Sequence, residues 1–258
     1  MKTVLTLVMV LFASAVIVRA DLLQRLGLTK PKGGTNQTAA LSLNSLSQDQ
    51  MIGGLKEALA KGVQNAVSQL GRDSGFLTNL NVKIPMPEKL RMVEKTLRTL
   101  KQDKLADDFV RSMNSAAEKA VPEAAAVFSD AIKQMTIADA KSILTGTNNA
   151  ATQYFRQVTE TNLFTRFYPV VTNATQQVGV TAYYKRMTAP AGSGSSLGGL
   201  LGGTGLIKAE DLDVDKYVTG KALDGLFKMV AEEEKRIREN PVARTTDLLK
   251  TVFGASGK

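Results

Sequence analysis

The segment 149–168 carries polar and ionisable side chains whose spacing is suited to binding. Asn149, Gln153, Arg156 and Glu160 lie within about 60° of one another when the segment is drawn as a helix. A strip of amide, guanidinium and carboxylate groups predicts a surface that binds a sugar or a carboxylate. The alternative is an ordinary amphipathic helix whose polar face is in water. The opposite face is expected to pack in the core and holds Ala151, Tyr154, Phe155 and Val158.

Many of the chain's aromatic residues lie in the same region, between residues 154 and 184. Arg166 precedes Phe167 and Tyr168, and a guanidinium at this position can stack on a ring or bind an anion. Such a cluster is explained either by core packing or by a ligand groove. If the protein has a groove, the residues predicted to bind its ligand are Asn149, Gln153, Tyr154, Arg156, Glu160, Arg166 and Tyr168.

Composition narrows the chemistry that these side chains can perform. The chain has 258 residues and contains no histidine and no cysteine. A Ser-His-Asp triad, an imidazole base, a histidine-ligated metal and a thiol nucleophile are therefore excluded. No metal site and no cofactor are predicted, and an enzyme built on this chain would need carboxylates, Lys, Tyr, Ser/Thr or a bound cofactor. Glu57, Glu160 and Asp224 are conceivable acids, although the sequence does not pair them.

Three consecutive acids, Glu232, Glu233 and Glu234, suggest paired carboxylates at first sight. Adjacent residues of a helix point in directions about 100° apart, so the three side chains do not converge. Glu232 with Arg236 and Glu234 with Arg238 are four residues apart. This spacing predicts surface ion pairs on a solvated helix face.

Asp211, Asp213 and Asp215 resemble the start of a calcium loop. Lys216 stands where that loop needs a glycine, and Ala222 stands where it needs a glutamate. Aspartates that precede a helix also cap it and interact favourably with its dipole. Capping is therefore the favoured interpretation, with calcium binding as the alternative.

The N-terminus has the pattern of a secretory signal peptide. Lys2 precedes an uncharged, mostly apolar run that ends at Arg19, and residues 18–20 fit a cleavage site before Asp21. A membrane anchor is the alternative, but the apolar run is shorter than the roughly 20 residues that a spanning helix needs. We expect residues 1–20 to be removed and the mature chain to be exported without a transmembrane span. The destination would be the periplasm in a bacterium and the extracellular space otherwise.

Hydrophobic periodicity after the leader indicates an all-α protein. Residues 21–46 read as a disordered leader, and from residue 47 apolar side chains recur at helical spacing with no strand pattern of useful length. We expect one domain of about eight to ten helices over residues 47–254, followed by a tail at 255–258. The expected helices include two at 148–161 and 162–178 and a long one at about 214–238. A Gly- and Ser-rich stretch at 189–206 is predicted to be a flexible insert.

The chain is basic, with 33 Lys and Arg against 24 Asp and Glu. The densest basic stretch, residues 83–104, lacks the interleaved aromatic residues that stack on bases, so no nucleic-acid partner is predicted. A solvated helix face is one explanation of this stretch. Attraction to an anionic envelope surface or polymer is the other.

Several blocks of sequence resemble one known family. They include residues 54–59, 82–85, 104–109, 117–124, 151–156, 222–227 and 245–249, and the pair Met113-Asn114. Together they resemble the bacterial family of domains of unknown function numbered 4197, over residues 50 to 254 apart from the insert. The resemblance implies an exported, all-helical domain of a kind common in bacterial envelopes, with no established activity. Many members look like lipoproteins, whereas this chain lacks the cysteine that a lipid anchor requires.

The leading hypothesis is an exported, non-enzymatic helical binding or scaffold module. Its partner would be an envelope or extracellular ligand, with an anionic polymer, a lipid and a protein as candidates. The first alternative is a carboxylate-based glycan hydrolase or lyase of the cell envelope, and the second is a calcium-dependent binding module. A buried carboxylate lining a groove at 149–168 would favour the enzyme. An open apolar groove without a buried charge would favour binding of a lipid or a partner helix.

Overall fold

The computed structural model describes residues 48–177, 179–180, 182–184 and 212–239. Over these residues the all-α prediction is confirmed, since seven α-helices have described bounds and there is no strand. Two short 3-10 turns, η1 (Glu88–Leu90) and η2 (Val121–Glu123), precede α4 and α6. The predicted signal peptide, leader, insert and tail lie outside the described residues. The helices are α3 (Gln48–Leu70), α4 (Arg91–Thr99), α5 (Asp103–Ala120), α6 (Ala124–Gln134), α7 (Ile137–Thr145), α8 (Ala150–Gln177) and α11 (Val214–Glu239).

Local sequence explains most helix boundaries. In α3 the predicted apolar stripe is buried at Leu55, Leu59, Val63 and Leu70, and the helix ends at the residue before Gly71. At the start of α7 the side chain of Thr136 accepts a hydrogen bond from the backbone of Asp139, and the Asp139 carboxylate accepts one in return. This reciprocal capping box satisfies backbone N–H groups that the first turn leaves without partners.

The prediction of two helices over 148–161 and 162–178 was wrong, because the chain forms one continuous helix, α8. Thr159, Leu163, Phe167 and Val171 are all buried at a spacing of four residues across the expected break. Their burial against neighbouring helices keeps one helical register through a stretch whose threonines have weak intrinsic helix propensity.

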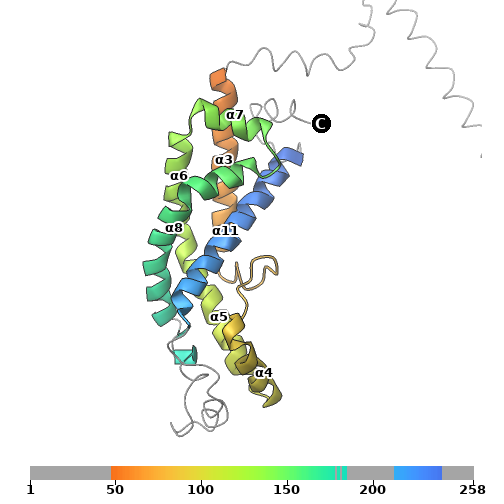
Figure 1. The fold of residues 1–258 in the computed structure, drawn as a ribbon, viewed down its shortest axis with the longest axis vertical. Coiled ribbons are helices and arrows are strands. Elements are labelled where there is room, and N and C mark those ends of the chain that lie inside the picture. The colour runs from red at the N-terminus through yellow and green to blue at the C-terminus, as the bar shows by residue number, and fades with distance from the viewer. Residues whose placement is uncertain (1–47, 178, 181, 185–211, 240–258) are drawn as a thin grey trace, which may run out of the picture. The chain divides into compact units, whose positions relative to one another are not determined.

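Helix α11 forms the centre of the described domain. It packs against α8, α3 and α5, and α8 in turn packs against α5, α6 and α7 (Figure 1). Buried side chains form a wide face of α11, while Lys221, Asp224, Lys228 and Lys235 keep the opposite face exposed. The ring of Phe227 meets Phe128 edge-on at 6.0 Å between centroids, and Phe128 meets Phe155 at 5.0 Å. None of the described helices is long and apolar enough to cross a membrane.

Two buried polar side chains of α5 hold the connection between α3 and α4. The Oδ1 atom of Asn114 accepts the N–H of Ile84 at 2.9 Å, and its Nδ2 atom donates to the Ile84 carbonyl at 2.9 Å. The carboxylate of Glu118 accepts the N–H groups of Ser74 and Phe76 at 3.2 and 3.1 Å. The proline-containing segment is thereby fixed without secondary structure of its own, since its backbone groups find partners on a helix.

This connection also packs closely on α11. A Cβ atom at Gly225 would lie 2.7 Å from the ring of Phe76, so the absence of a side chain lets the loop approach the helix. Burial raises the pKa of Glu118, and the hydrogen bonds from Phe76 and Ser74 oppose this shift without reversing it. Glu118 therefore acts as a buried acceptor for the loop rather than as a surface acid.

Candidate functional site

A groove of about 420 Å³ lies between α8 and α11 and contains two of the acids that the sequence singled out, Glu160 and Asp224. Apolar lining comes from the aromatic ring of Phe164 and the nearly buried Leu223. Hydroxyl groups come from two threonines of α8. The full lining is Glu160, Thr161, Phe164, Thr165, Gly220, Leu223 and Asp224.

Arg156 joins the two carboxylates of this groove. Its Nη1 atom lies 2.8 Å from Glu160 on the same helix, and its Nη2 atom lies 3.6 Å from Asp224 on α11. The guanidinium also lies over the ring of Phe227, at 4.5 Å from the centroid. Lys221 is a second cation, with Nζ at 3.6 Å from Asp224. All four charged side chains remain substantially exposed, so the cluster is accessible to a ligand.

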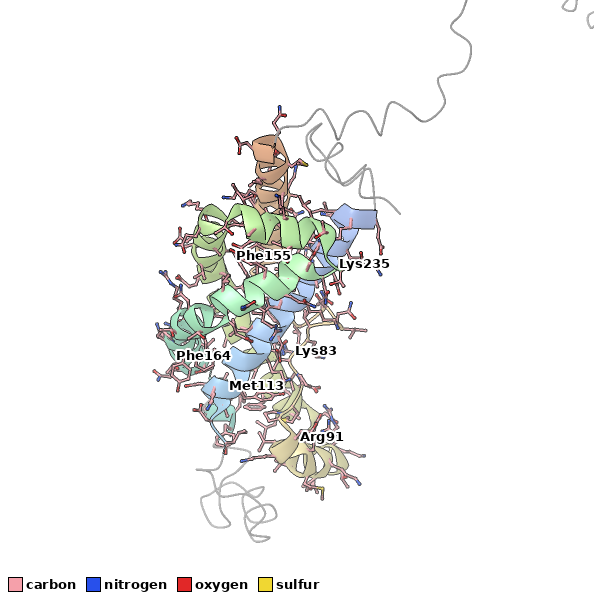
Figure 2. The ribbon with its side chains drawn as sticks, turned by 45° about the horizontal axis from the view of Figure 1, so that its top comes forward. Lys83, Arg91, Met113, Phe155, Phe164 and Lys235 are labelled. Carbon is pink, nitrogen blue, oxygen red and sulfur yellow. The ribbon has the colours of Figure 1, made fainter. Side chains whose placement is uncertain are left out.

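The aromatic ring and the glycine that line the groove are packed less closely than residues of the core. The rings of Phe164 and Tyr168 stack at 5.8 Å with an angle of 19° between planes, and both residues are half-buried (Figure 2 labels Phe164). A Cβ atom added at Gly220 would meet no atom within 4 Å. A glycine inside a helix costs about 0.5–1 kcal/mol relative to alanine, and no close contact at this position requires one. Its effect is to leave the groove open.

The other predicted site residues do not join this cluster. The side chain of Asn149 accepts hydrogen bonds from Thr147 and Gln153 and is exposed at the start of α8. Tyr154 points its hydroxyl at the carbonyl of Ala131 on α6 at 3.4 Å, and burial raises its pKa. Arg166 is exposed. Of the predicted polar strip, the structure therefore brings together Arg156 and Glu160.

The predicted core face of this segment needs one correction. Ala151 and Phe155 are buried and Tyr154 is half-buried, but Val158 is 49% exposed. Thr159 is buried instead, and its hydroxyl is satisfied by the Phe155 carbonyl at 2.7 Å. The face that packs in the core is therefore rotated from the expected one, because a threonine whose hydroxyl bonds its own helix can enter a core.

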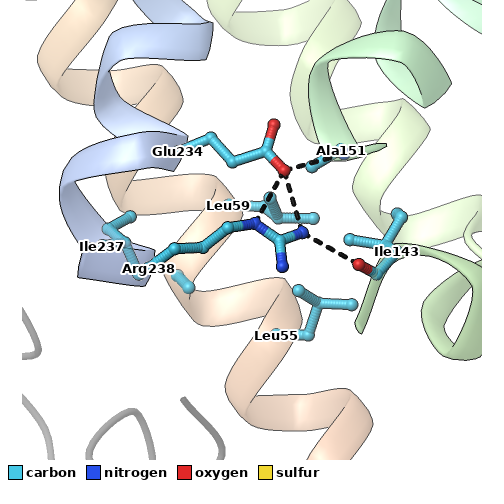
Figure 3. Close-up of a pocket in the computed structure, with 8 residues that line it drawn as sticks. Leu55, Leu59, Ile143, Ala151, Glu234, Ile237 and Arg238 are labelled. Carbon is cyan, nitrogen blue, oxygen red and sulfur yellow. Dashed lines mark hydrogen bonds and ion pairs between the residues drawn. The ribbon is translucent and has the colours of Figure 1, made fainter. Parts of the chain in front are cut away.

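The prediction of a solvated face at Glu232–Glu234 was wrong for two of the three acids. Glu233 and Glu234 are buried. Glu234 forms the expected pair with Arg238 at 2.9 Å, but it also accepts the N–H groups of Ala151 and Thr152 at 3.0 and 2.9 Å. Figure 3 shows this carboxylate at the start of α8 with the Arg238 guanidinium beside it. A carboxylate from α11 thus caps the N-terminus of α8, where a negative charge is stabilising.

The surroundings of Glu234 leave no space for a substrate. Arg238 also donates to the carbonyl of Ile143 at 2.8 Å, and the hollow beside the pair has a volume of about 10 Å³, no larger than one water molecule. Glu233 is similarly engaged, since it accepts hydrogen bonds from Asn65 and Gln69 of α3. Arg236 pairs with Glu233, while the exposed Glu232 accepts from Asn81.

The favoured interpretation of the aspartates before α11 is confirmed at Asp213. Its carboxylate accepts the N–H of Lys216 at 2.8 Å, as expected of an N-cap residue. Asp215 accepts a hydrogen bond from the Thr175 hydroxyl at 2.7 Å and thereby joins the end of α8 to the start of α11. Asp211 lies outside the described residues. Among the described residues, no cluster of three or more acids is arranged to hold a metal ion.

Together, the helices and the groove define an all-helical domain with an open, polar and aromatic surface site between two long helices. The chain belongs to a family described as a protein of unknown function (DUF4197), whose sequence model matches residues 45–254. The resemblance drawn from the sequence blocks is thereby confirmed. Comparison with curated proteins and with solved structures found no match.

The sequence named Glu160 and Asp224 as conceivable acids without pairing them, and it did not predict that Gly220 and Leu223 lie beside them. Asp224, Gly220 and Leu223 come from α11 and reach Glu160 only through the packing of two helices far apart in the chain. The one available signal was Gly220, a glycine inside a long predicted helix. A second groove of about 460 Å³ lies between α3 and α6, lined by aliphatic and small polar side chains together with Lys133.

Proposed function

We propose that this protein is an exported helical binding module whose ligand site is the groove between α8 and α11. The observation that carries the proposal is the convergence of Arg156, Glu160 and Asp224 beside Phe164 in a groove that Gly220 leaves open. Export is supported by the signal-peptide pattern of residues 1–20. Mass spectrometry of the secreted chain tests that part, with a mature N-terminus at Asp21 as the expected result.

The chemistry of the groove suits a ligand with hydroxyl groups on one side and an apolar face on the other, as sugars have. The carboxylates of Glu160 and Asp224 accept hydrogen bonds from hydroxyl groups, and the guanidinium of Arg156 donates them. Phe164 offers an aromatic surface against an apolar ring face. The two acidic and two basic side chains of the cluster balance in charge, which favours a neutral ligand over a strongly charged one.

A glycan hydrolase or lyase is the second candidate, because two carboxylates do converge at Arg156. Glycosidases need a carboxyl that burial keeps protonated to act as the general acid. Among the residues that the structure describes, the buried carboxyls are Glu118, Glu233 and Glu234. They lie away from the groove and are occupied by structural hydrogen bonds. The arrangement of the groove therefore supports binding more than catalysis.

A matched pair of glycine variants tests the proposal. Gly220 and Gly53 are both helical, and a Cβ atom at either position meets nothing within 4 Å, but only Gly220 lines the groove. Leucine is a better helix former than glycine, so both Gly220→Leu and Gly53→Leu are expected to fold. Thermal unfolding is then measured with N-acetylglucosamine oligosaccharides and with muropeptides.

A ligand at 100 times its dissociation constant adds about 2.7 kcal/mol of stability, which raises the Tm of a chain of this size by roughly 5–10 °C. The shift is expected for the wild type and for Gly53→Leu, and it is expected to disappear in Gly220→Leu. Equal shifts in all three proteins would place the ligand elsewhere. Release of reducing ends from the oligosaccharides, lost in Glu160→Gln, would establish the hydrolase instead.

A further inference from the structure

We propose that the exposed side of α4, together with the turn that ends this helix, binds to an anionic lipid membrane. The helix lies at the margin of the domain and packs mainly on α5 (Figure 1). Val93 and Leu97 point into the core, which leaves Arg91, Met92 and Lys95 on the outer side (Figure 2 labels Arg91). This surface is separate from the groove between α8 and α11.

Basic side chains outnumber acidic ones by seven to five over residues 88–111, and all five of these acids lie in ion pairs. Glu94, Asp103 and Asp107 all converge on Arg98, at 2.8, 3.3 and 3.1 Å. Asp108 binds Lys104 and Arg111, and Glu88 binds Arg91. Within the described parts of the chain, no ion pair is found for the exposed side chains of Lys95 and Lys101. These two ammonium groups are therefore available to anionic headgroups.

Apolar side chains lie beside these lysines. Met92, one turn before Lys95, is 58% exposed, and Leu100, next to Lys101, is 39% exposed. Large exposed apolar residues that alternate with lysines are typical of surfaces that enter the headgroup region of a bilayer. A soluble polyanion would use the lysines alone, so the exposed methionine and leucine favour a lipid surface over such a polymer.

The backbone at Lys101 provides an independent reason to assign a function here. Lys101 has φ of 58°, in the left-handed region. The N–H of Gln102 donates to the Leu97 carbonyl at 2.8 Å, and that of Lys101 donates to Arg98 at 3.1 Å. This is the pattern of a helix end at which glycine is the favoured residue. A lysine is strained at this position, and unusual backbone conformations of this kind concentrate at functional sites.

The absence of tryptophan from the chain allows a direct test. Met92→Trp places a single indole on the proposed surface, and Val158→Trp places one at an exposed position of α8 as the control. Each variant of the mature chain, residues 21–258, is titrated with vesicles of phosphatidylcholine that contain about one third phosphatidylglycerol, and with vesicles of phosphatidylcholine alone. A blue shift of fluorescence is expected only for Met92→Trp with anionic vesicles, and added salt should weaken it.

Variants that remove lysines measure how much positive charge contributes to the affinity for vesicles. Each lysine near an anionic surface contributes about fivefold in affinity, so Lys95→Ala with Lys101→Ala should weaken binding by roughly 25-fold. Lys119→Ala with Lys141→Ala removes the same charge from exposed positions of α5 and α7 and should change affinity much less. Lys101→Gly should weaken vesicle binding while raising the Tm, a combination that a purely structural role would not produce.

Three results would overturn the proposal. One is an unshifted Met92→Trp spectrum in a folded protein with anionic vesicles at low salt. Another is equal loss of binding in the two lysine pairs, which would mean that only net charge matters. The third is tight binding of heparin that depends on Lys95 and Lys101 without any vesicle binding, which would make the surface a polyanion site. Gly220→Leu should leave vesicle binding unchanged, so failure here is distinguishable from failure of the proposed ligand groove.

Discussion

Two arginine–carboxylate clusters join α8 to α11, and their environments are opposite. At the start of α8 the side chains of Glu234 and Arg238 are 5% and 10% exposed, and both carboxylate oxygens accept hydrogen bonds from the first turn of the helix. At the groove, Arg156 and its two acids are 42–56% exposed. The same residue types thus form a structural link in one place and an accessible surface in the other.

The difference shows that burial and hydrogen-bond saturation, rather than composition, separate structural charges from available ones. A desolvated ion pair is tolerated only when every polar atom has a partner, as around Glu234. An exposed ion pair contributes little to stability. Its two side chains can therefore separate and bind a ligand at a small cost in free energy. The charged side chains of the groove can therefore bind a ligand with little loss of folding stability.

Replacement of Glu234 by alanine should have the largest effect on stability. It leaves the Arg238 charge buried and removes the acceptor for two N–H groups of α8, which should lower the free energy of unfolding by about 3–5 kcal/mol. Urea-induced unfolding followed by circular dichroism measures the loss. The neighbouring Glu232→Ala is the control and should change stability by about 0.5 kcal/mol or less. Equal losses in both variants would contradict the assignment of Glu234 as the cap of α8.

Asn114→Ala extends the comparison to the buried polar side chains that hold the connection between α3 and α4. The side chain of Asn114 satisfies both backbone groups of the buried Ile84, so its removal leaves an N–H and a carbonyl without these partners. The expected loss is about 1–3 kcal/mol. Hydrogen exchange should show faster exchange at Ile84 than in the wild type. A protected Ile84 amide in Asn114→Ala would mean that packing of the loop, and not this side chain, holds it.

Much of the helical architecture could be predicted from the sequence, because its determinants are local. The apolar spacing in α3, the Thr136 and Asp139 box of α7 and the long uninterrupted pattern of α11 each act within a few turns. The continuity of α8 depends instead on burial of its middle against other helices. No local feature distinguishes that burial from a break between two shorter helices.

The candidate site was less predictable for the same reason. The spacing of Glu234 and Arg238 predicts a pair, but its burial depends on the start of α8 about 80 residues earlier in the chain. Likewise, Glu160 and Asp224 share Arg156 only because α8 packs along α11. Two of the sequence blocks that resemble the family are in contact in the structure, because Asn114 in the pair 113–114 hydrogen-bonds to Ile84 in residues 82–85.

Arg156→Met should have only a small effect on stability, in contrast with Arg238→Met. Its ion pairs are exposed and contribute about 0.2–1 kcal/mol, and its contact with the Phe227 ring adds a similar amount that methionine partly replaces. Urea unfolding should therefore give a loss of about 1 kcal/mol or less. In the oligosaccharide titration the same variant should lose most of its ligand-induced shift. A large loss of stability would mean that the groove cluster is structural and would remove the distinction between the two clusters.

The smallest expected effect is the pH dependence of stability that the buried carboxyl of Glu118 causes. Because burial raises its pKa in the folded state, the folded protein binds more protons than the unfolded chain between the ordinary carboxyl value of 4.5 and the raised value. Stability from this group is then greatest below that window and decreases as the pH rises through it. The free energy of unfolding of the wild type, relative to that of Glu118→Gln, should therefore fall as the pH is raised from about 4 to about 7. A relative stability of the wild type that rises over this pH range would mean that the hydrogen bonds from Ser74 and Phe76 outweigh the desolvation of this carboxylate.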